Sequence, residues 1–247
     1  MGRLSGKNVL ITGASTGFGR GIALACAAEG ANVALIARSA DKLNEVAEAV
    51  RALGVQAVVC PADVGQREEL LAAVAAAKSA LGLLHVLVNN AGTNVAQRSI
   101  QETSSDQWRL LLNVNLTSAF LLTQAVLPDM IAQGGGTIIN IASRAATFPS
   151  LMAGVGYSTS KIGMQSLTDV TNEEGNPHNV RACVINPGEG NTPILDRRAV
   201  PPSDDERVDM LQPEDLGETV VMVASLPPRA NIWRVDMKPT RKRAGQP

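Results

Sequence analysis

The chain has few aromatic, histidine and cysteine residues. Only 2% of its 247 residues are Phe, Trp or Tyr, and it has three cysteines and two histidines. The cysteines are far apart, odd in number and set in apolar stretches, so we expect reduced, buried thiols and a cytoplasmic protein. His85 and His178 are isolated and form no zinc-binding pattern, so we expect no metal site.

A strong net charge and a long apolar run are also missing. The 22 Lys and Arg residues nearly balance the 23 Asp and Glu residues, which argues against nucleic acid as the main partner. No uninterrupted apolar run approaches the roughly 20 residues that cross a bilayer. Residues 1–6 are too short and polar to begin a signal peptide. We therefore expect a single domain over residues 1–247 with no membrane partner.

Short apolar runs alternate along the chain with longer segments of helical character. The runs are apolar throughout, which is typical of strands that are covered on both faces. This pattern predicts an α/β fold of the Rossmann type, a doubly wound parallel sheet of about seven strands with helices on both faces. The predicted strands are Asn8–Thr12, Asn32–Ala37, Val55–Val59, His85–Asn89, Thr137–Ile141, Val180–Ile185 and Ile232–Met237. The predicted helices are Gly19–Glu29, Asp41–Leu53, Gln66–Leu81, Asp106–Ile131, Gly156–Thr171 and Pro213–Ser225.

A glycine-rich turn lies between the first predicted strand and the first predicted helix. Gly13, Gly17 and Gly19 allow the backbone to approach a phosphate closely, and the helix that follows presents free amide groups to it. Tight packing alone is the other explanation for such a turn. Its position after the first strand favours nucleotide binding.

The end of the second predicted strand indicates which nucleotide is bound. An acidic residue there would accept hydrogen bonds from a ribose 2′-hydroxyl, but the sequence has Ala37, Arg38 and Ser39. A guanidinium pairs with a 2′-phosphate, so NADP is favoured over NAD. The alternative is that Arg38 is a solvent-facing charge at a strand end.

Tyr157, the only tyrosine, lies four residues before Lys161, which places both side chains on one face of a helix. An ammonium about 5 Å from the phenol favours the phenolate by roughly 3 kcal/mol, or about two pKa units. This brings the phenol toward the range needed for acid/base catalysis near neutral pH. The spacing by itself is also compatible with a purely structural pair.

Taken together, the motifs resemble those of the short-chain dehydrogenase/reductase family over essentially the whole chain. The motifs are the glycine turn TGxxxGxG, the segment Asn89–Gly92, Ser143, the Tyr157–Lys161 pair and the segment Asn186–Gly188, in that order. The resemblance implies a Rossmann-type enzyme that transfers a hydride between a nicotinamide and a carbonyl or secondary alcohol. It implies a small-molecule substrate.

The resemblance also implies roles for individual residues. Tyr157 would be the general acid/base, Lys161 would hold the ribose hydroxyls, Ser143 would orient the substrate carbonyl, and Asn115 would support a proton-relay water. The residues implied to bind the cofactor are Gly13, Ser15, Thr16, Gly17, Phe18, Gly19, Arg38, Asp63, Val64, Asn89, Ala91, Gly92, Tyr157, Lys161, Pro187, Gly188 and Thr192. Simpler roles are open for some of them: Asp63 as a turn cap, Asn115 as a helix polar group, and Ser143 as a turn residue.

Some positions depart from the family pattern. The interval from Ser143 to Tyr157 is 157 − 143 = 14 residues, about one longer than is common in the family, which predicts a reshaped substrate wall. Thr16 stands where many NADP-specific relatives have a basic residue, so Arg38 must carry the NADP preference almost alone.

Two further segments have an expected role. Proline-rich residues 188–212 read as a substrate lid, and residues 238–247 as a flexible basic tail. The long apolar helices resemble the family's interface helices, so we expect a homotetramer. A catalytically silent NADP(H)-binding regulator or scaffold on the same fold is the alternative function.

Overall fold

Seven parallel strands form one sheet in the computed structural model of the chain, which describes residues 1–197 and 200–241. The strand order is β3-β2-β1-β4-β5-β6-β7, with each neighbouring pair parallel. This confirms the predicted doubly wound sheet. The strands are β1 (Asn8–Thr12), β2 (Asn32–Ala37), β3 (Ala57–Pro61), β4 (Val86–Asn89), β5 (Gly136–Ile141), β6 (Val180–Pro187) and β7 (Arg234–Met237).

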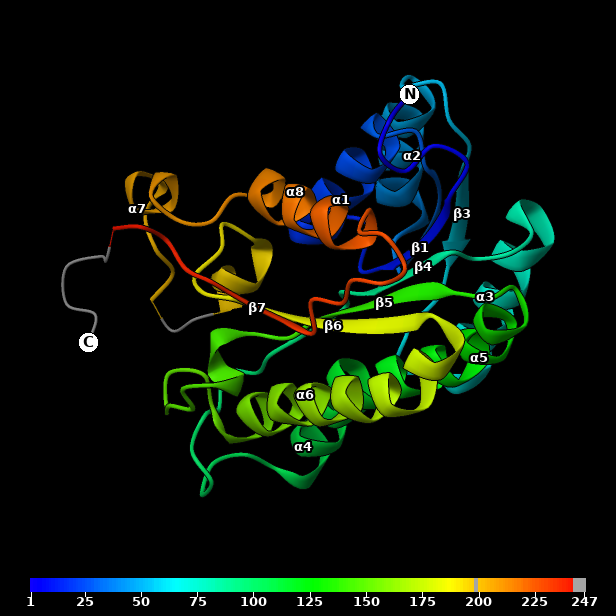
Figure 1. Cartoon of the computed structure of the whole chain (residues 1–247). Helices are drawn as coiled ribbons and strands as arrows, with labels where there is room; N and C mark the ends of the chain where they lie inside the picture. The colour runs from blue at the N-terminus through cyan, green and yellow to red at the C-terminus, as the bar shows by residue number, and fades with distance from the viewer. Residues whose placement is uncertain (198–199, 242–247) are drawn as a thin grey trace.

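Helices cover both faces of this sheet. Figure 1 shows α1, α2 and α8 on one face and α3, α4, α5 and α6 on the other. These helices are α1 (Gly17–Ala28), α2 (Ala40–Arg51), α3 (Arg67–Leu81), α4 (Ser105–Leu112), α5 (Ser118–Ala132), α6 (Val155–Gly175) and α8 (Pro213–Ala224). Shorter elements are α7 (Asp204–Val208), the π-helical turn η1 (Asn113–Thr117) and the 3-10 turns η2 (Arg144–Ala146), η3 (Asn176–His178) and η4 (Pro193–Arg197).

Buried aliphatic side chains fill the space between the sheet and each helical layer. Successive side chains of a strand point to opposite faces, so Val9 and Ile11 pack in the core beneath α1, α2 and α8, whereas Leu10 packs in the core beneath α3 and α5. Burying one such side chain contributes about 1.5–3 kcal/mol. Two covered faces explain why the strand sequences are apolar throughout.

The chain reverses its direction of travel across the sheet at β1. It first runs outward through β2 to β3 and then returns to β4 on the other side of β1. The loops after β1 and β4 therefore diverge and leave a crevice outside the carboxyl ends of the strands. The topology places this crevice where the predicted glycine turn lies.

Several elements differ from the sequence prediction: β7 begins two residues later than expected, β6 ends two residues later and α6 ends four residues later. β3 begins at Ala57, two residues later than expected, and ends at Pro61, which is tolerated because β3 is an edge strand and needs no further amide donor there. The helix predicted over residues 106–131 consists of α4, η1 and α5 in succession.

This succession forms a continuous helical stretch, Ser105–Ala132, of 28 residues that is long and apolar enough to cross a bilayer by length and composition alone. The helix predicted over residues 106–131 corresponds to this stretch, but its apolar character over a membrane-spanning length was not expected. Half of its most apolar window is buried within the protein, and α5 packs against α3, α6 and the sheet. The stretch therefore lies where a core helix that covers one face of the sheet is expected.

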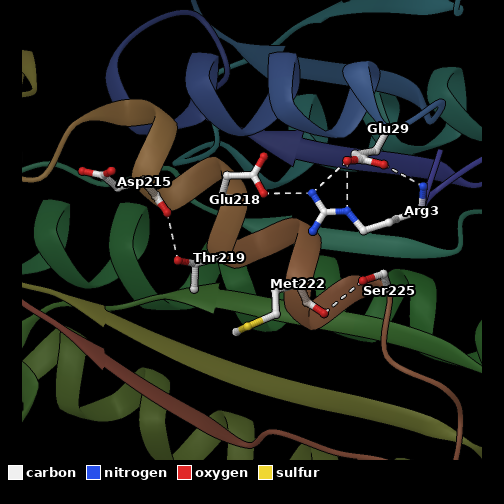
Figure 2. Close-up of polar contacts among 7 residues, drawn as sticks. All are labelled: Arg3, Glu29, Asp215, Glu218, Thr219, Met222 and Ser225. Carbon is white, nitrogen blue, oxygen red and sulfur yellow. Dashed lines mark hydrogen bonds and ion pairs between the residues drawn. The ribbon is translucent and has the colours of Figure 1, made fainter.

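An ion-pair cluster ties the N-terminal segment to the α1/α8 layer (Figure 2). The Arg3 guanidinium lies 2.8 Å from Glu29 Oε1, at the end of α1, and 2.8 Å from Glu218 Oε2, on α8. The Arg3 backbone amide also donates to Glu29. Hydrogen bonding to Arg3 holds the pKa of the Glu29 carboxyl below its ordinary value.

Helices α1 and α8 approach each other closely through two glycines. A Cβ added to Gly21 would overlap the Pro213 carbonyl, and one added to Gly217 would lie 2.7 Å from the Ala25 Cβ. The neighbours at Gly21 are the backbone carbonyl and the ring Cβ of Pro213, which cannot move without shifting α8. The close contact between α1 and α8 therefore requires glycine, which has no side chain, at both positions.

We predict that Gly21→Ala destabilises the protein by about 1–3 kcal/mol, although alanine is the better helix former, because the added methyl forces α1 and α8 apart. Urea denaturation measures the effect. Gly163→Ala is the matched control, since its added Cβ meets only the tip of the flexible Leu116 side chain. Equal stability of Gly21→Ala and the wild type would contradict the close-packing argument.

Candidate active site

A cleft of about 860 Å³ lies along the carboxyl edge of the sheet and collects most of the predicted site residues. Its walls come from the turns after β1 to β6. The predicted residues that line it are Gly13, Ser15, Thr16, Gly17, Phe18, Arg38, Asp63, Val64, Ala91, Gly92, Ser143, Tyr157, Lys161, Pro187, Gly188 and Thr192. A second depression, lined by Asn191, Arg207 and neighbouring lid residues, holds none of them.

The glycine turn has the shape that a phosphate group requires. Gly13 and Gly17 have positive φ values of 65° and 52°. Thr16, the N-cap of α1, makes no side-chain capping bond, and the first turn of α1 has no acidic residue. The amide groups at this helix end therefore face the cleft without a capping side chain or an opposing negative charge, and they fit the pyrophosphate of a dinucleotide.

Hydrogen bonds fasten the glycine turn to the loop after β4. Thr12 Oγ1 accepts from the backbone amides of Asn90 and Ala91, each at 3.0 Å, and Asn90 Nδ2 donates to the Thr12 carbonyl at 2.9 Å. Gly19 lies behind the turn, where a Cβ would overlap the Gly13 carbonyl. Gly19 therefore sits outside the cleft wall and keeps the turn compact.

Two cations line the end of the cleft that follows β2. Arg38 is exposed at the end of β2, as predicted, and Lys42, in the first turns of α2, lines the same wall. Lys42 was not among the residues predicted from the sequence, because no spacing rule relates a residue in a turn to one in the helix that follows. Asp63, also on this wall, accepts from the Gly65 amide at 2.9 Å, so it caps its own turn as well.

Tyr157 and Lys161 lie on α6 and face the cleft. Lys161 Nζ is 5.8 Å from the centroid of the Tyr157 ring. The Lys161 side chain is buried and donates to the Ile141 carbonyl at 2.8 Å. Burial lowers the pKa of Lys161 to about 7, an effect that the sequence argument did not include.

Asn115 lies behind the wall, in the π-helical turn η1. Its Oδ1 accepts from the Thr93 amide at 2.8 Å, and its Nδ2 donates to the Thr93 carbonyl and to Ser160 Oγ. A Cβ built on Gly92 would lie 3.5 Å from Lys161 Nζ and 3.6 Å from Asn115 Oδ1. Asn115 and Lys161 therefore both approach Gly92, and Asn115 holds the loop after β4 through Thr93.

Ser143 and Asn89 occupy different depths of the site. Ser143 follows β5 on the cleft wall, and its Oγ accepts from the Ala145 amide at 3.1 Å. Asn89 is buried in β4, where its Nδ2 donates to Asn140 Oδ1 at 2.8 Å, so it links two strands behind the cleft. Asn140 in turn donates to Thr168 on α6.

The loop before α6 is held by residues that the sequence analysis did not single out. Asn94 Nδ2 and Arg98 Nη1 both donate to the Ala153 carbonyl at 3.0 Å, and the Val155 amide donates to the Arg98 carbonyl. Gly154, with φ of 90°, forms the N-cap of α6. The longer interval before Tyr157 is thus taken up in an anchored loop.

The lid segment over residues 188–212 contains more structure than its prolines suggested. Gly190 and Leu211 form a parallel bridge at its two ends. Between them lie η4 and α7, the latter with a capping box formed by Ser203 and Glu206. The expected tail is described only up to Arg241, which lies 3.9 Å from Asp209; residues 242–247 lie outside the described residues.

The family follows from a direct comparison with known proteins. Residues 7–200 match the family model for short chain dehydrogenases. An uncharacterized oxidoreductase of Staphylococcus aureus strain N315 is 31% identical over 236 residues, which is 96% of this chain and 98% of the relative. The chain therefore belongs to the short-chain dehydrogenase/reductase family. Its members are NAD(P)-dependent oxidoreductases that act on CH-OH and C=O groups, and this chain is such an enzyme.

Solved structures of similar proteins have the same fold. A metagenomic short-chain oxidoreductase in complex with NADP has a TM-score of 0.84 and 32% identity, and the match covers 97% of this chain and all of that one. A 3-ketoacyl-(acyl-carrier-protein) reductase from Brucella melitensis, complexed with NADH, has a TM-score of 0.86 and 28% identity, covering 96% and 99%. A nicotinamide cofactor is thus common to these neighbours.

We predict that Lys161 makes stability depend on pH above neutrality. Its pKa is about 7 in the folded chain and 10.5 in its ordinary state, so the unfolded chain binds more protons between these values and stability rises with pH across this window. Lys161→Met should flatten this rise, as measured by urea denaturation of the cofactor-free protein at a series of pH values.

The control for this experiment is Lys238→Met, which removes an exposed lysine near the C-terminus and should keep the wild-type slope. A Lys161→Met slope equal to that of the wild type would show that the buried ammonium does not lose its proton near neutral pH.

Proposed function

We propose that the protein is an NADP-dependent oxidoreductase that transfers a hydride between the nicotinamide and a carbonyl or secondary alcohol, with Tyr157 as general acid/base. The observation that carries the proposal is the single cleft that places Ser143, Tyr157 and Lys161 at one end and the glycine turn with Arg38 at the other. The bound nicotinamide supplies or accepts the hydride. The protein positions both partners and moves the proton.

In the direction of reduction, the substrate oxygen lies between Ser143 and Tyr157. Because Ser143 Oγ already accepts a backbone hydrogen bond, its hydroxyl proton is directed to the substrate oxygen. Tyr157 gives its phenolic proton to that oxygen as negative charge develops there. Lys161, in its protonated form, stabilises the phenolate that remains, and Asn115 keeps the loop beside Lys161 in place.

We predict that Tyr157→Phe retains NADPH binding but loses about 10²–10⁴-fold in turnover, because the ring survives and the proton donor does not. Steady-state assays of NADPH absorbance on a panel of ketones, aldehydes and secondary alcohols measure this. Turnover within a few-fold of the wild type would mean that the proton comes from another group.

The alternative function, a catalytically silent NADP(H)-binding regulator or scaffold, is not supported by the family to which the chain belongs. The presence of Tyr157, Lys161 and Ser143 on one cleft argues against it, since a protein that only binds the cofactor has no need of a proton donor. Tight NADPH binding with no turnover across the whole panel would favour the regulator.

We propose that NADP is preferred over NAD because Arg38 and Lys42 line the end of the cleft where the adenosine ribose would lie. Ala37 offers a 2′-hydroxyl no acceptor side chain, whereas the guanidinium makes charge-assisted contacts with a 2′-phosphate. Lys42 supplies a second cation, whereas position 16, which is basic in many NADP-specific relatives, is Thr in this chain. Ser39 caps α2 and fixes the turn that connects the two cations.

We predict that NADP binds about ten- to a hundred-fold more tightly than NAD, as one charged hydrogen bond of roughly 1.5–3 kcal/mol allows. Arg38→Ala should remove most of this preference and Lys42→Ala a smaller part, while Ala37→Asp should invert it. Calorimetric titration with both cofactors measures the ratios. Equal affinities in the wild type, or an unchanged ratio in Arg38→Ala, would make Arg38 only a surface charge.

We also propose a homotetramer located in the cytoplasm, with residues 188–212 serving as a lid over the nicotinamide. The free, buried cysteines Cys26, Cys60 and Cys183 are compatible with a reducing compartment. The lid borders the cleft through Thr192 and Leu195. Its tied ends give a segment that can close without unfolding.

Apolar side chains on the outer face of the α5/α6 layer support the tetramer. Phe120, Ile162 and Val170 are 46%, 43% and 56% exposed, although each lies on a helix that packs against the sheet. We predict that light scattering gives about four times the 25.8 kDa mass of the chain. Phe120→Glu should reduce this mass, and a wild-type monomer at micromolar concentration would contradict the assembly.

A further inference from the structure

Arg144 stands directly beside a proposed catalytic residue and is not used by the mechanism above. It follows Ser143 in the chain, is exposed and lines the cleft. Its guanidinium lies 5.2 Å from the centroid of the Phe148 ring. Within residues 1–197 and 200–241, no acidic group forms an ion pair with it.

The position of Arg144 in the sheet separates it from the cations at the adenosine end. Arg38 and Lys42 follow β2, whereas Arg144 follows β5, three strands further along the sheet. At about 4.8 Å per strand this is roughly 14 Å. A single cofactor phosphate therefore cannot bind both Arg144 and the cations after β2. The Arg144 guanidinium, beside Ser143, lies at the end of the cleft where the proposed substrate would bind.

The other charged groups at the substrate end are engaged. Arg98 donates to the Ala153 carbonyl and so belongs to the loop that precedes α6. Glu189, which lines the cleft on the lid side, has an interaction of its own. Among the charged side chains described at this end of the cleft, Arg144 thus contacts an aromatic ring and not a polar group.

The surroundings of Arg144 are apolar. Phe148 and Met152 line the cleft and are 63% and 55% exposed, and Leu151 beside them is 75% exposed. A guanidinium stacked on a ring keeps its planar edge of N–H donors free to point away from the ring. This edge matches a carboxylate in a bidentate arrangement.

We propose that the substrate is an oxo acid with an apolar body, and that Arg144 is the specificity-determining residue that binds its carboxylate. This assignment rests on the proposed function, since it places the reacting carbonyl at Ser143 and Tyr157. The apolar body lies against Phe148 and Met152. A carboxylate bound to Arg144 fixes the carbonyl a few bonds away, within reach of the Ser143 hydroxyl.

The test compares medium-chain oxo acids, differing in the position of the ketone, with the methyl ester of each acid. With NADPH as reductant, the wild type should have a higher kcat/KM for the acid than for its ester by about ten- to a hundred-fold. Arg144→Ala should bring this ratio close to one, and Arg144→Lys should retain part of it. Arg229→Ala removes an exposed arginine that precedes β7, at the amino ends of the strands and away from the cleft. This variant should keep the wild-type ratio.

A binding measurement keeps this test independent of turnover. An oxo acid and NADP⁺ are both oxidised and do not react, so calorimetry on the NADP⁺-loaded protein reports affinity alone. The wild type should bind the acid about ten- to a hundred-fold more tightly than Arg144→Ala does. If acid binding requires Arg144 but no carbonyl compound is turned over, the proposed function fails and the carboxylate site stands.

Other outcomes overturn the assignment. An acid-to-ester ratio near one in the wild type, or one that is unchanged in Arg144→Ala, would make Arg144 a wall residue packed on Phe148. A clear preference for ketones that carry a phosphate ester over the oxo acids would assign the guanidinium to a phosphate in place of a carboxylate.

Discussion

The parallel pairing of β1 with both β2 and β4 is the constraint from which the site follows. It forces the chain to leave β1 in one direction and return on the other side, so two loops that diverge at the carboxyl edge must be joined by something other than strand pairing. Thr12 and Asn90 supply that connection through hydrogen bonds between the glycine turn and the loop after β4. The two loops are thereby held in place relative to each other.

Burial of Lys161 has two opposing effects, because it holds the side chain in place but disfavours its positive charge. The apolar surroundings that hold Lys161 in one position also lower its pKa to about 7, which weakens its effect as a cation on Tyr157 near neutral pH. A negative charge that develops beside it, on a phenolate or a bound anion, favours the protonated form again. The electrostatic support for the phenolate is therefore strongest when that charge is present.

The cleft has cations at both ends and few free carboxylates between them. Arg38 and Lys42 line the end that follows β2, and Arg144 lies beside Ser143. Asp63 is engaged in its own turn, which removes it as a competing partner for these cations. Such a distribution suits two anionic ligands that lie end to end, and it gives the two ends separate selectivity.

The sequence by itself determined the order of strands and helices, because runs such as 8–12 and 32–37 are apolar on both faces and only a sheet covered on both sides can bury them. It also predicted the candidate site residues that sit in local motifs, namely the glycine turn and the pair Tyr157–Lys161. These depend on spacing within one strand–turn–helix unit or one helix, which the sequence displays directly.

Only the tertiary structure decided which residues support these motifs. Asn115 and Lys161 both approach Gly92 because a π-helical turn and the loop after β4 come together. Arg98 anchors Ala153 from more than fifty positions away, and Arg144 lies on the cleft wall at β5, three strands from β2. The depressed pKa of Lys161 likewise arises from burial by surrounding elements. Contacts between distant segments and the burial they produce are properties of packing, and no local pattern in the chain encodes them.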